Sequence, residues 1–360
     1  YALITSGGNV GIGVADPSEE LEVKASGDCA IIINTSTASN DAQLKFATGD
    51  SEDWMVYVDG SATNDPLIFY DAHGTAGNRL ILDTNSRISL GNNDTSAVIS
   101  TTIFGYLAGQ DIASGATHNT YYGSYAGSEN TDGDQNTYIG ANAGKGVNGN
   151  ANSGNTAVGN DAMLAVTDGG NNTTVGLSSG QALTTGDQNV FIGSSAGYST
   201  QDVDYAVCIG NNAAIGVMDS DANGTIAIGY SALRNLTSGG GNIAIGHQAL
   251  LGHTTGARNI ALGWKAMDDT DANDCPTSVD NVMIGYDAGG GTWANNDSNS
   301  NVGVGNYVMD AAMDGALNNT AVGHLGLSAL TTGGANTAVG ANAGDALLGG
   351  GNNVMMGIHA

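Results

Sequence analysis

Two short acidic stretches carry side chains of the kind that bind calcium. In each, three oxygen-bearing side chains alternate with other residues: Asp219, Asp221 and Asn223 in the first, and Asp269, Asp271 and Asn273 in the second. Such alternation opens the calcium loop of the EF-hand, whose twelfth residue is a bidentate Glu. The first stretch has Tyr230 at that position, which excludes an EF-hand. We expect either a loose Ca²⁺ site or solvated turns built on Asp and Asn side chains. The sequence indicates no other cofactor.

Rings recur at one position of a repeating pattern, immediately after a glycine. They belong to Tyr230, His247, Trp264, Tyr286 and His324. Exposed rings offer large apolar contact area with a polar edge, so this column is a candidate for binding a surface glycan. The alternative interpretation is an exposed or inter-chain packing column without a ligand.

No combination of residues identifies a catalytic centre. The six histidines lack metal-ligand spacing, and Cys29, Cys208 and Cys275 are too few and too scattered for a disulfide framework or a metal site. Carboxylates are numerous enough that a glycosidase-like pair could form between chains, but no pair stands out. We therefore expect a protein that is not an enzyme.

Composition and charge exclude several classes of partner. Eight basic residues against 35 acidic ones give a net charge of −27, so nucleic acid and anionic membrane would be repelled. No run approaches the ~18 apolar residues that span a bilayer, and we expect no membrane insertion. The chain holds 57 glycines in 360 residues but only three prolines, which argues against collagen and against proline-rich linkers.

The elements that must position these residues form a long repeat. A glycine, here called the motif glycine, recurs fifteen times with a modal spacing of 17 residues: Gly105, Gly123, Gly140, Gly159, Gly176, Gly193, Gly210, Gly229, Gly246, Gly263, Gly285, Gly305, Gly323, Gly340 and Gly357. Such self-similarity is typical of solenoids, and 17 residues suit one coil of a β-roll or β-helix. The sequence therefore predicts an all-β, stacked parallel solenoid of about 15 coils over residues 101–360. At ~4.8 Å per coil it would be roughly 65–70 Å long.

The columns of the repeat predict which side chains face inward. Asn stands four residues before the motif glycine in twelve of fifteen copies, which suits a hydrogen-bonded ladder at a corner. The positions three and one before the glycine hold β-branched and large aliphatic residues, so we expect this pair of columns to face the core. We then expect Ala three residues after the glycine to point inward, a weaker apolar column at seven after it, and a left-handed corner at the Gly or Asn ten after it.

The intervening column, two residues before the motif glycine, is then expected to face outward. Its members include Tyr121, Tyr138, Phe191, Met283 and Met355. Because these side chains are large and apolar, we predict that they form the seam between chains. An inward Thr column also excludes ice binding, which uses flat rows of water-facing Thr.

Residues 1–100 predict a separate small β module. Short β-rich runs at 30–33, 43–46, 54–58 and 67–70 are separated by turn-forming clusters. The segment Gly8 to Gly13, with Asp16-Pro17 and Leu21 to Val23 after it, resembles an element common in phage tail fibres and related fibrous proteins. Residues 85–91 are a degraded second copy of that element.

The repeat carries a second resemblance. The pattern Asn-Thr-Ala-Val-Gly-x-x-Ala-Gly, as at residues 336–344, is similar to the head repeat of trimeric autotransporter adhesins and to repeats of phage tail-fibre proteins. That resemblance implies a homotrimer of parallel β-rolls, although the adhesin repeat is shorter than 17 residues.

Together the two resemblances imply a virion tail fibre for host attachment, with other tail proteins and a host surface glycan or protein as partners. The alternatives are a bacterial cell-surface adhesin or extracellular fibre protein, and a polysaccharide-cleaving tailspike.

Overall fold

The computed structural model divides the chain into two compact units, Tyr1–Ser89 and Leu90–Ala360. The structure describes residues 3–6, 9–12, 21–23, 33, 41–48, 51–58, 67–71, 77–82, 88–89 and 101–360, the last range without 114–115, 148, 150, 271–276 and 294–295. The division lies near the boundary expected at residue 100.

The N-terminal unit holds two small sheets. In one, β1 pairs antiparallel with β2, which pairs parallel with β3; in the other, β4 to β8 are antiparallel in chain order. The strands are β1 (Leu3–Ser6), β2 (Asn9–Ile12), β3 (Leu21–Val23), β4 (Ala42–Thr48), β5 (Ser51–Val58), β6 (Leu67–Asp71), β7 (Gly77–Leu82) and β8 (Ile88–Ser89). The expected strands at 43–46, 54–58 and 67–70 lie in β4, β5 and β6. The one expected at 30–33 lies outside the described residues apart from Ile33.

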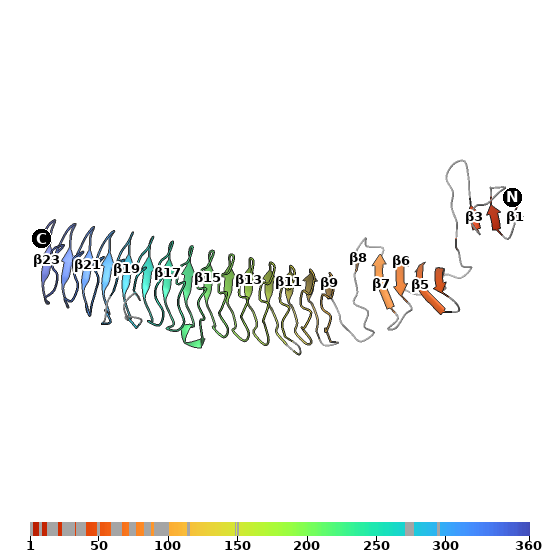
Figure 1. The fold of residues 1–360 in the computed structure, drawn as a ribbon, viewed down its shortest axis with the longest axis horizontal. Helices are drawn as coiled ribbons and strands as arrows, with labels where there is room; N and C mark the ends of the chain where they lie inside the picture. Colours follow the sequence, from red (N-terminus) through yellow and green to blue (C-terminus); the bar gives the residue numbers. More distant parts are fainter. Residues whose placement is uncertain are drawn as a thin grey trace. The chain divides into compact units, whose positions relative to one another are not determined.

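The second unit is a β-solenoid built on one parallel sheet (Figure 1). Fifteen strands of three residues pair in chain order and in register, one from each coil. They are β9 (Thr102–Phe104), β10 (Thr120–Tyr122), β11 (Thr137–Ile139), β12 (Thr156–Val158), β13 (Thr173–Val175), β14 (Val190–Ile192), β15 (Val207–Ile209), β16 (Ile226–Ile228), β17 (Ile243–Ile245), β18 (Ile260–Leu262), β19 (Val282–Ile284), β20 (Val302–Val304), β21 (Thr320–Val322), β22 (Thr337–Val339) and β23 (Val354–Met356). This confirms the all-β stacked solenoid with a modal period of 17.

The remainder of each coil consists of tight turns with left-handed residues. Two and four residues after the motif glycine, and five before it, φ is positive; Ser178, Met163 and Gln188 are examples at 52°, 54° and 59°. A β-branched residue in this conformation is strongly disfavoured, and none stands at any of these positions that the structure describes. Within the part of the solenoid that the structure describes, the single helical element is the 3₁₀ turn η1 (Ser220–Ala222), in a 19-residue coil.

The motif glycine permits adjacent coils to stack. At Gly159, φ is +137° and an added Cβ would lie 2.4 Å from the carbonyl oxygen of Gly176 in the next coil. The glycine ten residues further on forms the expected left-handed corner in some coils only. φ is positive at Gly239, Gly315 and Gly350, at 89°, 78° and 98°. At Gly133, Gly186 and Gly256 it is not, and an added Cβ would lie 1.9–2.2 Å from a carbonyl oxygen of the next coil, so close approach requires glycine there.

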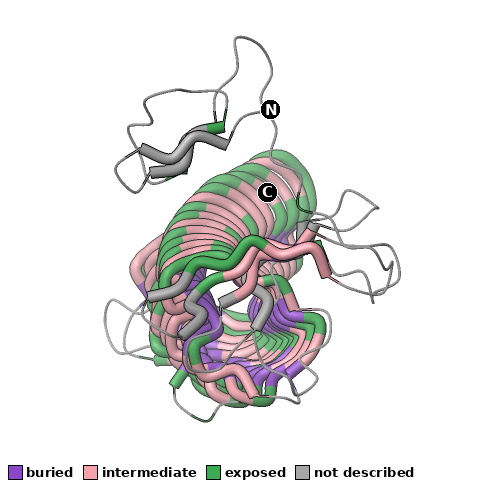
Figure 2. The backbone as a smooth tube through the Cα atoms, turned by 90° about the vertical axis from the view of Figure 1, so that its right-hand side faces the viewer, coloured by how far each residue is buried: buried purple, intermediate pink, exposed green. Residues whose placement is uncertain are grey.

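The predicted facing of the strand columns is wrong. The middle residue of the strand, two before the motif glycine, points into the core: Tyr121, Tyr138, Phe191 and Met283 are fully buried. The first and third residues face outward and are half-buried or exposed. Figure 2 shows the buried residues gathered on the inner wall of the coils. The sequence correctly predicts that the middle residue faces the opposite side from the first and third. In a strand of only three residues, however, the pattern does not indicate which of the two sides faces the core. The Ala column three after the glycine is buried as expected, for example Ala126 and Ala249.

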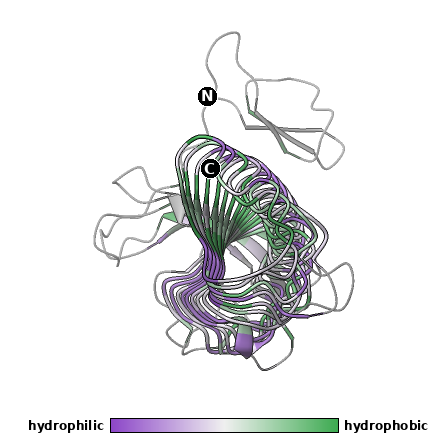
Figure 3. Ribbon diagram, turned by 90° about the vertical axis from the view of Figure 1, so that its left-hand side faces the viewer, coloured by the Kyte–Doolittle hydropathy of each residue, from purple (hydrophilic) through white to green (hydrophobic). Residues whose placement is uncertain are grey.

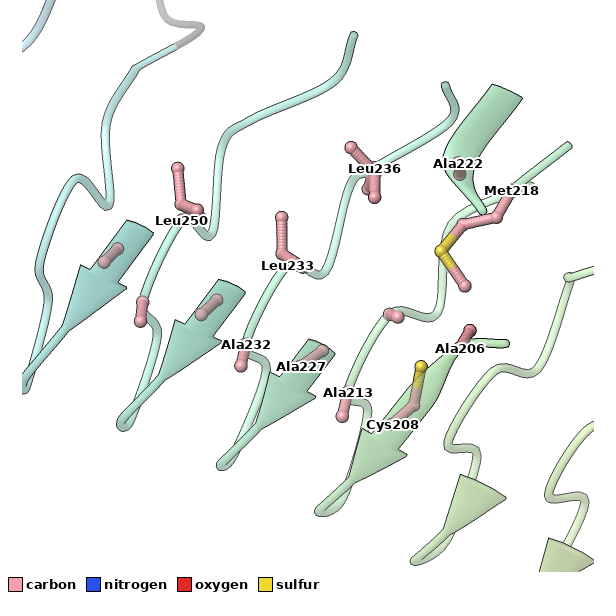
Figure 4. Close-up of a cluster of buried hydrophobic side chains, with 14 of the residues drawn as sticks. Ala206, Cys208, Ala213, Met218, Ala222, Ala227, Ala232, Leu233, Leu236 and Leu250 are labelled. Carbon is pink, nitrogen blue, oxygen red and sulfur yellow. The ribbon is translucent and has the colours of Figure 1, made fainter. Parts of the chain in front are cut away.

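The core is filled by complementary side chains within each coil. Where the middle strand residue is aromatic, Ile or Met, the residue four after the motif glycine is Gly, and where it is Ala that residue is Met or Leu in five of six coils. An added Cβ at Gly144 would lie 2.4 Å from the Tyr138 ring, whereas Ala227 is matched by buried Leu233 (Figure 4). At Gly344, opposite Ala338, the space is taken by Leu327 and Met355 of the adjacent coils. The coil interior thus keeps nearly constant volume, as close packing requires.

An asparagine ladder closes one corner of the coils, as expected. Asn172 is buried, and its Nδ2 donates to the Gly186 carbonyl of its own coil at 2.8 Å and to Asn155 Oδ1 at 3.2 Å. Its Oδ1 accepts from the backbone N of Asn189 at 2.9 Å. The same bonds continue across the 22-residue step from Asn259 to Asn281. The ladder therefore holds coil stacking in register while loops of different length leave the coil elsewhere.

Candidate functional site on the solenoid surface

The outward side of the fifteen-stranded sheet is a regular surface with one strand from each coil. We call it the sheet face and define it as the first and third residues of strands β9 to β23. No charged residue occupies any of its positions, although the chain carries a net charge of −27. Third-position side chains such as Ile192, Ile245 and Val322 are 37%, 40% and 42% exposed. Figure 3 shows how residues of similar hydropathy from successive coils align into stripes along the solenoid.

The ring residues singled out in the sequence do form columns. Tyr230, His247 and Trp264 stack with centroid separations of 5.0 and 4.0 Å and interplanar angles of 18° and 7°. His247 lies between the other two rings, whereas Tyr230 and Trp264, at the ends of the stack, are each 48% exposed. His247 Nδ1 is buried and has no hydrogen-bond partner among the described residues. The three rings support each other whether or not they bind a ligand.

The column is interrupted between Trp264 and Tyr286. Tyr286 turns instead to Tyr307, edge to face at 5.2 Å, and Tyr307 contacts His324 at 6.0 Å. Within the described part of the chain, Trp264 and Tyr286 form no ring contact with each other, and they are 48% and 43% exposed. Tyr307 was not singled out in the sequence because it stands two residues after its glycine, beside the column rather than in it.

Carboxylates surround this interruption. Lys265 pairs with Asp268 at 3.2 Å, and the backbone N of Asp287 donates to the Trp264 carbonyl at 2.9 Å. Burial raises the pKa of Asp268 and of Asp310, and the Asp287 carboxylate raises both further. The carboxylates are therefore close enough to repel one another.

Three side chains of the candidate calcium stretches accept hydrogen bonds. Asp219 caps η1 by accepting from the backbone N of Asp221 at 3.0 Å, which is an Asx turn. Asn223 Oδ1 accepts from the backbone N of Asp204 at 2.7 Å, and Asp269 accepts from the Thr292 hydroxyl at 2.5 Å, both across coils. Asp271 and Asn273 lie outside the described residues.

A second aromatic cluster, on the first two coils, was missed in the sequence. Phe104 and Tyr122 stack at 5.0 Å on the sheet face, and Tyr106 meets Tyr125 edge to face at 5.6 Å. Phe104 and Tyr122 share one repeat column, whereas Tyr106 and Tyr125 stand in two others, so reading one column at a time did not group all four.

The described residues contain no group of three His, Cys, Asp or Glu side chains placed to hold a metal ion. His253 and Cys208 are buried in the core, where burial lowers the pKa of His253 to about 4 and raises that of the Cys208 thiol.

Comparison with protein-family models, with curated proteins and with solved structures finds no match to this chain. Among the residues described, no helix is long and apolar enough to cross a membrane.

Proposed function

We propose that this chain forms the shaft of a homotrimeric attachment fibre, of the kind found in phage tails, in which the sheet face is the contact between copies. The observation that carries the proposal is an uncharged, half-exposed face along all fifteen coils of an otherwise acidic chain. Monomeric proteins rarely expose so large a contiguous apolar patch. The seam expected from the sequence thus moves from the middle strand column, which is buried, to the two columns beside it.

The size of the face suits a stable contact. Fourteen steps of ~4.8 Å along the stack and three residues of ~3.3 Å along each strand give roughly 670 Å². A stable interface buries about 800 Å² per partner, so the face is of the right order. A second copy fits it best, because an identical face is equally apolar and has the same coil spacing. The number three comes from the resemblance to trimeric fibres.

Sedimentation velocity tests the proposal. The wild-type chain should have three times its mass of 35.9 kDa. Ile245→Asp, on the sheet face, should shift the mass to one chain without unfolding the coils, because the side chain points outward. Val217→Asp replaces an aliphatic side chain that is 54% exposed elsewhere on the coil and should leave the mass unchanged. A monomeric wild-type chain would contradict the proposal.

Ice binding is a second candidate, because the inward Thr column that excluded it is in fact outward. Thr102, Thr120, Thr137, Thr156 and Thr173 occupy the first position of five consecutive strands on the sheet face. The next seven strands carry Val or Ile there, which favours packing against protein. Thermal hysteresis of a freezing solution separates the two functions: the fibre shaft should show none.

A further inference from the structure

The aromatic column is interrupted between Trp264 and Tyr286, and the residues at this position indicate which ligand the proposed fibre binds. Trp264 and Tyr286 stand on adjacent coils, both largely exposed and without ring contact to each other. Tyr307 closes one side of this position by its edge-to-face contact with Tyr286. Three rings therefore lie along two steps of the solenoid in an arrangement that leaves ring surface open to solvent.

The charge around these rings is negative. Lys265 is engaged by Asp268, whereas Asp287 and Asp310 form no ion pair with any residue that the structure describes. Burial raises the pKa of Asp268, Tyr307 and Asp310, the hydrogen bond with Asp268 raises that of Lys265, and the Asp287 carboxylate adds to each of these four shifts. Aromatic rings combined with carboxylates attract ammonium groups, through cation–π contact and charge pairing.

We propose that Trp264, Tyr286 and Tyr307, with Asp287 and Asp310, bind the protonated amino groups of an amino-sugar polysaccharide. This ligand class rests on the proposed attachment function, which it makes specific. An amino sugar carries its charge on a rigid ring whose apolar side can pack on an aromatic side chain. A Lys side chain carries the same charge on a flexible stem and loses more rotamer entropy on binding.

The spacing of the solenoid favours a linear polysaccharide. Successive coils repeat at ~4.8 Å, which is about the length of one sugar residue in an extended chain. A chain lying along the solenoid therefore sets successive sugars against successive coils. Acidic polysaccharides are excluded as ligands by the same carboxylates and by the net charge of −27.

Isothermal titration with matched oligosaccharides tests the proposal on the intact chain. The probes are the β-1,4-linked glucosamine hexamer and its fully N-acetylated counterpart, which has the same backbone without the charges. The glucosamine hexamer should bind at least tenfold more tightly, and raising the salt concentration should weaken it. Equal affinity for the two hexamers would overturn the proposal. Hexalysine that binds as tightly as the glucosamine hexamer would also overturn it, by assigning the site to cationic peptides.

Variants locate the site. Asp287→Asn and Asp310→Asn keep the side-chain shape and should each weaken binding of the glucosamine hexamer about five- to tenfold, as should Trp264→Ala. Tyr198→Ala removes an exposed ring that lies off the sheet face and away from the site, and should have no effect. Unchanged binding in all three site variants would refute the assignment. Measuring the mass of the same samples distinguishes failure of the two proposals. A trimer that does not bind the glucosamine hexamer refutes the ligand site. A monomer that binds it refutes the trimeric shaft.

Discussion

Asparagine is suited to the ladder because its side chain combines two donor hydrogens with an acceptor oxygen. Each buried Asn donates to a carbonyl in its own coil and to the Asn before it, and accepts from the Asn after it. Aspartate lacks the donors, and a hydroxyl is too short to reach both neighbours. The two interruptions of the ladder, Ala206 and Thr225, stand together, where Thr225 bonds instead to the Ala222 carbonyl of the η1 loop.

Asn172→Asp should therefore destabilise the solenoid although it is isosteric. It removes two donated hydrogen bonds and places a buried carboxylate beside two acceptor oxygens. We expect a loss of roughly 3–5 kcal/mol in the free energy of unfolding, measured by urea denaturation. Asn160→Asp, at an exposed Asn, serves as the control and should cost less than ~0.5 kcal/mol. Equal effects of the two substitutions would refute the ladder as a source of stability.

His253 should make stability depend on pH. It is buried between the Thr270 hydroxyl and the Gly256 carbonyl, and burial lowers its pKa from 6.5 to about 4. The unfolded chain therefore binds more protons between these values, so the stabilisation is complete above pH 6.5 and is lost as pH falls toward 4. At pH 4.5 the loss should be about 2.5 kcal/mol relative to pH 7.

His253→Asn tests this dependence, because carboxylates also titrate in the same range. The difference in free energy of unfolding between the variant and the wild type should shrink as pH falls from 7 to 4.5. A difference that is constant with pH would show that His253 does not titrate on unfolding.

At the scale of the coil, packing follows a rule of constant volume. Phe191 is paired with Gly197, and Ala157 with Met163. Ala157→Phe alone should overpack the coil and cost about 1–3 kcal/mol. Met163→Gly alone should leave a cavity and cost about 2–4 kcal/mol, less any relief at its positive φ of 54°.

The double variant Ala157→Phe/Met163→Gly recreates the Phe191–Gly197 pair and should recover most of the loss. Denaturation of the four proteins in the cycle should give a favourable coupling of at least ~1 kcal/mol. Additive losses would mean that the two positions do not share one space.

The periodic features of the coil could be predicted from the sequence, and its facing could not. The motif glycine gave the number of coils and their register, and the buried Asn column was placed at a corner as found. The strand Thr-Ala-Val, however, is compatible with either orientation. Thr and Val could face the core, or Ala could face it, because Ala is small enough for a thin core and Thr and Val suit an exposed strand. The decisive signal was the pairing of the middle residue with the residue four after the glycine, large with Gly and Ala with Met or Leu. It can be read in the sequence once both positions are compared.

The candidate site was predicted in part for a similar reason. Tyr230, His247 and Trp264 share a repeat column, so their stacking follows from the period alone. The turn of Tyr286 toward Tyr307, and the carboxylates of Asp287 and Asp310 beside it, depend on side-chain directions in left-handed turns. No column of the sequence shows these directions.

At the scale of the whole molecule, the proposed contact between copies accounts for an uncharged, half-exposed sheet face on a chain that is otherwise acidic. The strong negative charge keeps the remaining surface soluble and repels chains that approach in any other orientation. An uncharged sheet face then becomes the side on which copies can meet. The proposed contact covers this face, and the proposed ligand site at the interrupted aromatic column lies elsewhere on the coil.

Cysteine labelling on the sheet face tests this central claim most directly. The experiment uses a chain in which Cys29, Cys208 and Cys275 are replaced by Ala. Val322→Cys lies on the sheet face and Leu317→Cys lies off it. The two positions are matched, because the native side chains are 42% and 41% exposed in the single chain. Ala321→Cys, in the core, should stay unreactive and so report that the coils are intact. If copies cover the sheet face, a maleimide reagent should label Leu317→Cys rapidly and Val322→Cys slowly. Equal labelling rates at the two positions would show that the face is bare in solution and would contradict the account.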